Sequence, residues 1–157
     1  MQPVSRATVQ AFYAAYGSGD PKRLAAFLDE DIEWLISGPV DVLRFCGQRR
    51  GKAAVLDVIE RLIPSTFELS GFYPETLLID GDCVATLSTL TGILIEGRRT
   101  FSYRLAHFLR FRDGKVITFR SVIDSFDAAE QVLGHAIDTS LSPLASELAV
   151  KGDRVAI

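Results

Sequence analysis

The stretch from Thr100 to Asp124 constrains the fold of this chain more than any other part of its sequence. Two long runs rich in aromatic and β-branched residues are separated there by Asp113-Gly114. An Asp-Gly pair between such runs is the strongest short-range signal for a β-hairpin, because glycine tolerates the positive φ that the turn requires. We therefore expect two long antiparallel strands that fold back on each other at Asp113-Gly114.

The first strand of this hairpin has one apolar face and one mostly polar face, because successive side chains of a strand point to opposite sides. The positions predicted to face the core are Phe101, Tyr103, Leu105, His107, Leu109 and Phe111. His107 is the one titratable imidazole on this apolar face, which makes it the best chemical clue in the sequence.

Helical patterns precede the hairpin. Asp20 can cap free backbone amides, and Pro21 suits the first position of a helix. Apolar residues at helical spacing predict further helices before and after this point, the first with an apolar stripe of Val9, Phe12, Tyr13 and Tyr16. The predicted segments are a helix from Ser5 to about Tyr16, a short helix after Asp20-Pro21, a strand from Ile32 to Ser37, a loop up to Gly51, and a helix from Lys52 to Ile63 that Pro64 ends.

From Phe67 onward the pattern is typical of strands. Gly71 and Pro74 predict a bend or bulge in the first of them, and Gly92 predicts a break in the second. A last short helix begins after Asp124, which suits an N-cap, and ends at Gly134. Helices followed by a run of strands indicate an α+β domain with helices on one face of a curved antiparallel sheet.

Bulk composition excludes several classes of protein. A net charge of −3 over 157 residues argues against a nucleic-acid binder. No apolar run approaches the length of a membrane span, and no signal-peptide core is present, so we expect a cytoplasmic protein. Cys46 and Cys83 are interpreted as free thiols, with one disulfide as the alternative. The two His and two Cys residues lack metal-ligand spacing, and no cofactor motif is found.

Several motifs occur in an order that resembles a known superfamily. They are the Gly17-Ser18-Gly19-Asp20-Pro21 turn, a strand bearing Trp34, Phe45-x-Gly47-x-x-x-Gly51 before a helix, and His107-x-x-x-Phe111-x-Asp113-Gly114-Lys115-Val116 before a last strand. From about Val4 to Gly134 the chain is similar to the nuclear transport factor 2-like superfamily, in particular its SnoaL-like, ketosteroid-isomerase-related branch. The resemblance implies a cone-shaped domain over residues 1–134, with residues 135–157 as a C-terminal arm of the same unit, and a homodimer packed sheet to sheet.

The resemblance also implies a pocket inside the cone. The candidate site residues are Phe12, Trp34, Tyr103, His107 and Ser121. One interpretation makes His107 the catalytic group, because an apolar pocket would lower the pKa of its imidazole and supply a neutral base. The other makes the aromatic residues ordinary core and gives His107 a hydrogen bond to nearby backbone.

The positions that carry ketosteroid isomerase activity do not match well. The oxyanion-donating tyrosine of that family corresponds to Phe12, its base to Leu35, and its second acid falls near His107. We therefore do not expect a steroid isomerase of that mechanism. Two hypotheses remain: a cofactor-independent acid–base enzyme (isomerase, dehydratase or cyclase) that acts on a small apolar substrate, and a non-catalytic module for ligand binding or dimeric association.

Overall fold

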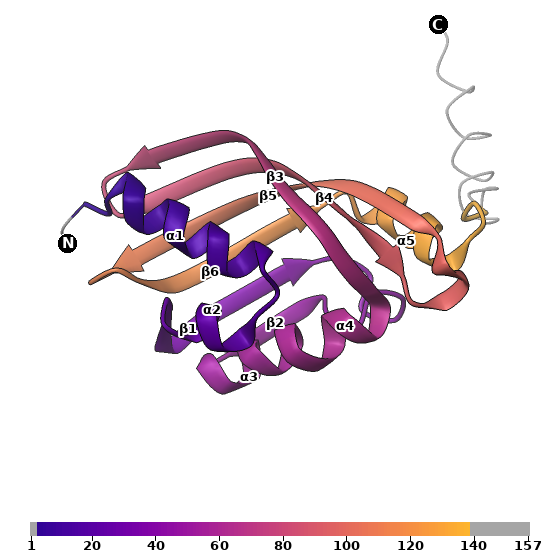
Figure 1. The fold of residues 1–157 in the computed structure, drawn as a ribbon, viewed down its shortest axis with the longest axis horizontal. Coiled ribbons are helices and arrows are strands. Elements are labelled where there is room, and N and C mark those ends of the chain that lie inside the picture. Colours follow the sequence, from indigo (N-terminus) through magenta and orange to yellow (C-terminus); the bar gives the residue numbers. More distant parts are fainter. Residues whose placement is uncertain (1–2, 139–157) are drawn as a thin grey trace, which may run out of the picture.

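The computed structural model describes residues 3–138 of the chain, and Figure 1 shows their arrangement. Most of the predicted arm at 135–157 therefore lies outside the described residues. The elements in order are α1 (Arg6–Gly17), α2 (Pro21–Ala25), β1 (Leu28–Ser37), β2 (Gly47–Arg50), α3 (Lys52–Asp57), the π-helix η1 (Val58–Leu62), α4 (Ile63–Thr66), β3 (Phe67–Asp80), β4 (Cys83–Leu94), the 3₁₀-helix η2 (Glu96–Arg98), β5 (Thr100–Arg112), β6 (Lys115–Ile123) and α5 (Ser125–Leu133).

The first two helices begin at side-chain caps. The Ser5 hydroxyl accepts a hydrogen bond from the Thr8 amide at 3.0 Å. Asp20 accepts one from the Lys22 amide at 2.8 Å, and Pro21 occupies the first position of α2. Caps of this kind satisfy amides that have no partner inside the helix. The predicted start of α2 is confirmed.

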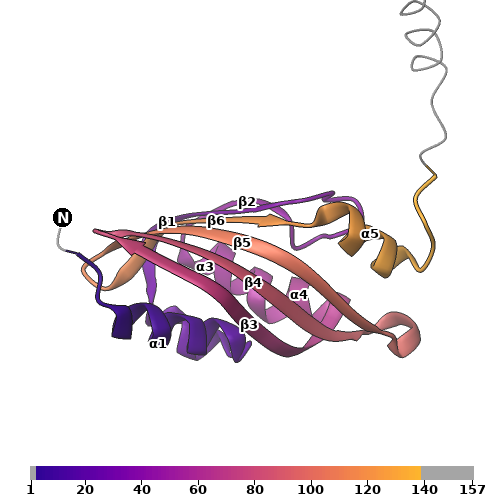
Figure 2. The ribbon, with the colours of Figure 1, turned by 90° about the horizontal axis from the view of Figure 1, so that it is seen from above.

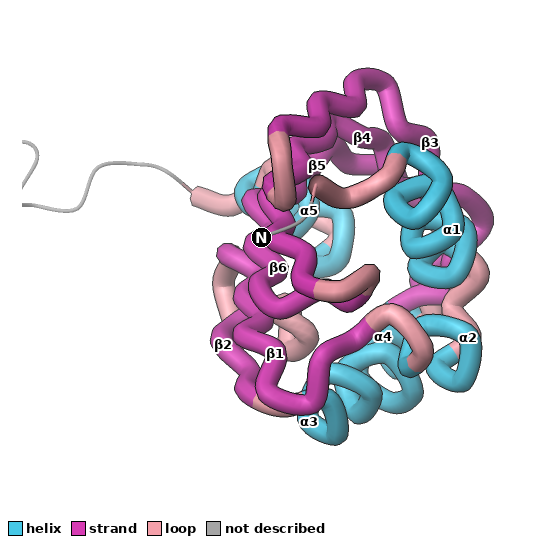
Figure 3. Tube along the Cα trace, turned by 90° about the vertical axis from the view of Figure 1, so that its left-hand side faces the viewer, coloured by secondary structure: helices cyan, strands magenta, loops and turns pink. Residues whose placement is uncertain are grey.

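Six strands form one curled sheet in the order β2-β1-β6-β5-β4-β3. Figure 3 shows that the sheet bends into an arc, and that helices α1 to α4 close the side that the arc leaves open. Seen from above, these helices lie along the concave face of the sheet (Figure 2). The α+β class and the curved sheet are as predicted. One pairing differs, because β1 and β6 run parallel. The long chain segment between them provides the crossover that parallel strands need.

The central hairpin is confirmed in detail. Strand β5 alternates between buried and outward-facing positions along its length, and the six predicted core residues are all buried. Asp113 and Gly114 form the turn with φ values of 51° and 77°. His107 faces the concave side, where its cross-strand neighbours are Thr86 on β4 and Ser121 on β6.

Three boundaries differ from the prediction. Strand β1 begins at Leu28, four residues before the predicted Ile32. The predicted loop before Gly51 contains β2, which pairs with β1. Pro64 does not end the third helix, because the chain passes through the π-helix η1 and Pro64 then lies in the first turn of α4. A proline there costs little, since the first-turn amides of a helix have no partner within it.

Strands β3 and β4 form the far side of the arc. The register of β3 shifts at Gly71 and next to Pro74, as predicted. Gly92 does not break β4, which continues to Leu94. A Cβ atom at Gly92 would lie 2.5 Å from the carbonyl oxygen of Glu68 on β3 and 2.5 Å from the ring of Phe101. The glycine thus allows close approach of two strands instead of interrupting one.

Helix α5 covers the part of β5 that β6 does not reach. The last pair of that ladder is Leu105 with Ile123. Beyond it, the side-chain amide of Gln131 accepts from the Ser102 amide at 2.9 Å and donates to the Ser102 carbonyl at 2.8 Å. The helix ends at Gly134 in the left-handed conformation, as predicted. One amide side chain therefore satisfies two backbone groups that would otherwise lie at an open strand edge.

Candidate functional site

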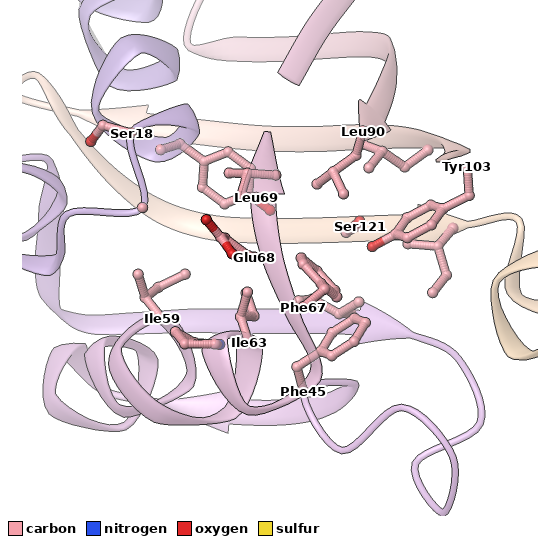
Figure 4. A pocket seen from close by; sticks show the side chains of 16 residues that line it. Ser18, Phe45, Ile59, Ile63, Phe67, Glu68, Leu69, Leu90, Tyr103 and Ser121 are labelled. Carbon is pink, nitrogen blue, oxygen red and sulfur yellow. The ribbon is translucent and has the colours of Figure 1, made fainter. Parts of the chain in front are cut away.

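A cavity of about 230 Å³ lies between the concave face of the sheet and the helices η1 and α4 (Figure 4). Ile59, Ile63 and Pro64 form its helical wall, and Phe45 and Phe67 extend this apolar wall. Ile59 projects from the π-helix, a rare local geometry that often occurs at functional sites. The remaining wall comes from the end of α1, from β1 and from strands β3 to β6.

The lining is mostly apolar, and besides Ser18, whose hydroxyl donates to the Ala15 carbonyl, it contains three residues with a hydroxyl group. They are Tyr16 on α1, Tyr103 on β5 and Ser121 on β6. Figure 4 shows the Tyr103 hydroxyl pointing inward, toward Ser121. Within residues 3–138 no side chain or backbone group forms a hydrogen bond with these hydroxyls. Their oxygen atoms are not fully buried either, so they keep some accessible surface. Each of them is therefore available to a ligand.

Burial fixes the protonation state of the two tyrosines. Removal from water raises the pKa of Tyr16 and that of Tyr103 well above the ordinary value, because the phenolate form would be poorly solvated. Both hydroxyls thus keep their proton at any physiological pH. They can donate hydrogen bonds to an oxygen acceptor on a bound molecule.

Glu68 is the one charged residue among those that line the cavity, as far as the described part of the chain extends. Its side chain is 63% exposed, and Oε2 lies 3.2 Å from Nη1 of Arg98. Figure 4 shows its carboxylate in front of the cavity, near Leu69 of the same strand. An exposed ion pair of this kind contributes little to stability, so the carboxylate is free to exchange its partner.

A second group of polar side chains lies next to the cavity, further along the same strands. The buried polar residues Thr86, Ser88, His107 and Ser121 occupy adjacent inward positions of β4, β5 and β6. Ser121 opens on the cavity, while the other three do not line it. We call Thr86, Ser88, His107 and the neighbouring Tyr13 the sealed cluster, because none of them lines this cavity; Tyr13 and Thr86 border a separate hollow between α1 and strands β3 and β4.

His107 is the centre of the sealed cluster. Its side chain has no exposed surface, and Nδ1 lies 3.3 Å from the Tyr13 hydroxyl, which in turn lies 3.1 Å from the Thr86 hydroxyl. Its Nε2 atom has no partner within residues 3–138. Burial lowers the pKa of His107 to about 3, because the charged imidazolium would lose its hydration. The ring is therefore neutral at physiological pH.

The structure separates the five predicted site residues into two groups. Tyr103 and Ser121 line the cavity. Phe12, Trp34 and His107 are buried but do not line it. Trp34 stacks on Phe119 with ring centroids 3.6 Å apart, and Phe12 packs among five other aromatic rings.

Sequence reasoning assigned no site role to Tyr13 and Tyr16, which it treated as part of an apolar helical stripe. Tyr16 reaches the cavity, and Tyr13 holds His107. A signal was present, since two tyrosines on the buried face of one helix bring two hydroxyls that need partners. Glu68 was also missed, because alternation along β3 gives no sign that its side chain borders a cavity.

The described residues form neither a metal site nor a membrane-spanning helix. Among residues 3–138 no group of three or more His, Cys, Asp or Glu side chains is placed to hold a metal ion. None of the described helices has the length and apolar character needed to cross a membrane. Cys46 and Cys83 are both free thiols, and burial raises the pKa of Cys46 to about 11.

Comparisons with known proteins agree on one family. The sequence model of the SnoaL-like domain matches residues 9–119. The crystal structure of a "Putative Isomerase" from Rhodopseudomonas palustris is 31% identical, with a TM-score of 0.77 over 84% of this chain and 100% of that one. A nuclear transport factor 2-like protein from Burkholderia xenovorans is 32% identical, with a TM-score of 0.66 over 78% and 91%.

A more distant structure shows the fold alone. A protein from Catenulispora acidiphila with a ketosteroid isomerase-like fold is 16% identical, with a TM-score of 0.68 over 89% of this chain and all of that one. The search of curated proteins found no match.

Proposed function

Because this chain belongs to the SnoaL-like domain family of the nuclear transport factor 2-like superfamily, we propose that its cavity binds a small, mostly apolar molecule and isomerises it without a cofactor. The observation that carries the proposal is the set of three available hydroxyls, from Tyr16, Tyr103 and Ser121, in one apolar cavity. The name of the Rhodopseudomonas palustris relative adds support for an isomerase.

The hydroxyls would act on an oxygen of the substrate. A carbonyl oxygen that accepts hydrogen bonds from Tyr16 and Tyr103 becomes more electron-withdrawing, which makes the proton on the adjacent carbon easier to remove. Donors fixed in an apolar cavity stabilise the developing enolate more than donors in water do. This set therefore supports proton transfer next to a carbonyl group.

Glu68 is the group at the cavity that can accept that proton. In the proposed reaction the substrate carries a carbon–carbon double bond at the β,γ position, and the carboxylate removes a proton from the carbon between this bond and the carbonyl, which gives a dienolate. The carboxyl then returns the proton to the γ carbon while the carbonyl re-forms, so the double bond has moved into conjugation with the carbonyl. Substrate and product have the same atoms and the same oxidation state, so no co-reactant is needed.

His107, the catalytic residue predicted from the sequence, provides the competing assignment. It lies beside Ser121 on the neighbouring strand, is fully buried and does not line the cavity. A catalytic role for His107 would require its neutral ring to act on the substrate through another residue, such as Ser121. Matched Glu68→Gln and His107→Gln variants separate the two, since each replaces a titratable group by an amide of similar size.

The experiment follows deuterium uptake from D₂O into the carbons beside the carbonyl of cyclic ketones, by NMR. We expect catalysed exchange in the native protein and a loss of about 10²–10⁴-fold in Glu68→Gln, the range typical of a general base. A loss of that size confined to His107→Gln would assign the base to His107 instead. Binding of ketones without any catalysed exchange would leave the non-catalytic ligand-binding module as the function.

A homodimer is the second element of the proposal, and the outer face of the sheet supports it. Leu78, Ala85 and Phe108 lie in one cross-strand row there, and the side chains of Leu78 and Phe108 are 64% and 52% exposed. Large apolar residues gathered on one face often mark an association surface. Sedimentation should show a dimer that Phe108→Glu converts to monomer; a native protein that sediments only as a monomer would refute this element.

The remaining expectations from the sequence belong to the same proposal. We propose a cytoplasmic protein, in keeping with its two free thiols. Its partners would be the small ligand and a second copy of the chain, with no role for nucleic acid or a membrane.

A further inference from the structure

The size and the charge of the cavity narrow the class of possible ligands further than membership of the family does. We infer that the ligand is a neutral carbonyl compound of one or two rings, which sets its oxygen against Tyr103, Tyr16 and Ser121 and its apolar body against the helical wall. This inference rests on the proposed function, since it takes the cavity to be the binding site.

The volume sets the size of the ligand. The cavity measures about 230 Å³. An apolar cavity of about 150 Å³ holds one benzene molecule, so this one accommodates a substituted ring or two fused rings. A four-ring steroid skeleton has almost three times the carbon atoms of benzene and, at the same density, needs about 450 Å³. About half of such a molecule would remain outside.

The charges set the ionisation state of the ligand. No Lys, Arg or His is found among the described residues that line the cavity, while Glu68 places a negative charge beside it. A carboxylate or phosphate ligand would lose its hydration and gain no cation in return, which is costly. A neutral molecule avoids both this cost and the repulsion by Glu68.

The hydroxyls set the functional group. An apolar molecule that filled the cavity would leave three hydroxyls without water and without a partner. Each buried donor left in that state loses a hydrogen bond that water would otherwise supply, which weakens the binding of such a molecule. A ligand oxygen at Tyr103 and Ser121 offsets part of that loss, so a carbonyl compound is preferred over a hydrocarbon of the same shape.

The arrangement of the walls sets the orientation. Tyr103 and Ser121 come from neighbouring strands, while Ile59 and Ile63 come from η1 and α4 across the cavity (Figure 4). A flat ligand with one polar end therefore fits in one direction. Its ring should shift the NMR signals of the Ile59 and Ile63 methyl groups.

The test compares four probes of matched design on the full chain. They are 1-tetralone (a neutral two-ring ketone), tetralin (the hydrocarbon of the same shape), 1-naphthoate (an anion of similar size) and progesterone (a four-ring ketone). Binding is measured by calorimetry, and its location by the methyl signals of Ile59 and Ile63. We expect 1-tetralone to bind at least tenfold more tightly than each of the other three.

Two variants connect this preference to the hydroxyls. Tyr103→Phe should remove most of the preference for 1-tetralone over tetralin, because the phenylalanine keeps the shape and lacks the donor. Tyr73→Phe is the matched control, since Tyr73 is 57% exposed and does not line the cavity. It should bind all four probes as the native protein does.

The outcomes separate the two levels of the proposal. If progesterone or 1-naphthoate binds at Ile59 and Ile63 as tightly as 1-tetralone, the cavity is a binding site but the ligand class inferred here is wrong. Equal affinity for tetralin and 1-tetralone would also overturn the ligand class. If neither these probes nor a wider library of apolar compounds shifts the Ile59 and Ile63 signals, the proposed function itself fails.

Discussion

The concave face of the sheet carries two polar groups of similar composition and opposite character. The hydroxyls of Tyr16, Tyr103 and Ser121 have no hydrogen-bond partner within residues 3–138, and all three residues line the cavity. The sealed cluster around His107 lies one residue layer away, and Tyr13 and Thr86 bond there within the protein. The two groups come from the same strands and the same helix, and they differ in whether they reach the cavity.

This difference shows that a perturbed pKa and a functional surface are separate properties. His107 has the most strongly shifted imidazole, and its shift comes from the same enclosure that keeps a ligand away from it. The tyrosines of the cavity have a shifted pKa and also a surface that a ligand can reach. Perturbed groups indicate function only where they are accessible.

The largest expected effect concerns the aromatic core beneath the cavity. Trp34→Ala should lower the free energy of unfolding by about 3–5 kcal/mol, because Trp34 is fully buried against Phe119. Ile63→Ala, in the cavity wall, should cost only about 1 kcal/mol, because its side chain is partly exposed and borders existing space. Denaturant titration measures both. A Trp34→Ala protein of native stability with weaker 1-tetralone binding would instead place Trp34 in the site.

Acid should affect the sealed cluster next most strongly. The pKa of His107 is about 3 in the folded state and about 6.5 in the unfolded state, so only the unfolded chain takes up this proton as the pH falls through 6.5. His107 alone should lower stability by about 2 kcal/mol between pH 7 and pH 5. His107→Gln should lack this loss.

The control for that experiment is His135→Gln, because His135 is exposed and is the other histidine of the chain. This variant should keep the native dependence on pH in denaturant titrations. An unchanged slope in His107→Gln would mean that the ring is hydrated in the folded protein and that the cluster is not sealed.

Two tyrosines one helical turn apart give the sharpest comparison. Tyr13→Phe should destabilise the fold by about 1.5 kcal/mol, because it removes a hydroxyl that His107 and Thr86 both contact. Tyr16→Phe should change stability by less than about 0.5 kcal/mol, because its hydroxyl has no partner within residues 3–138. It should weaken 1-tetralone binding. Equal destabilisation by both changes would show that the two groups form one network.

The smallest effects concern two serines. Ser88→Ala should raise stability by about 0.5–1 kcal/mol, because the Ser88 hydroxyl is sealed without a partner among the described residues. Ser121→Ala should leave stability unchanged and reduce the affinity for 1-tetralone a few-fold. Thermal unfolding and calorimetry measure these changes. The comparison would fail if Ser88→Ala altered ligand binding or Ser121→Ala altered stability.

The sequence was sufficient for features that depend on local chemistry. Alternation identified the inward face of β5, and the turn at Asp113-Gly114 followed from the φ that glycine allows. The caps at Asp20 and Asp124 follow from side chains that bond to nearby amides. Each of these features depends on a few neighbouring residues.

Features that depend on distant parts of the chain were not predictable in this way. Strand β2 exists because β1 offers it an edge, and its own sequence is polar. The parallel pairing of β1 with β6 joins segments separated by most of the domain. Periodicity placed Phe12 and Tyr16 on the same buried face, but it gave no depth, so it could not show that only Tyr16 reaches the cavity.

Gly92 lies outside the cavity, and it influences the position of a strand that forms part of the cavity wall. Its missing side chain lets β4 lie so close to β3 that a single added carbon would collide with the backbone at Glu68. An alanine at this position would press on the Glu68 carbonyl and on the Phe101 ring together, so either β3 or the ring would have to move. Gly92 does not line the cavity, so this substitution would act on a cavity strand through a residue that no ligand touches.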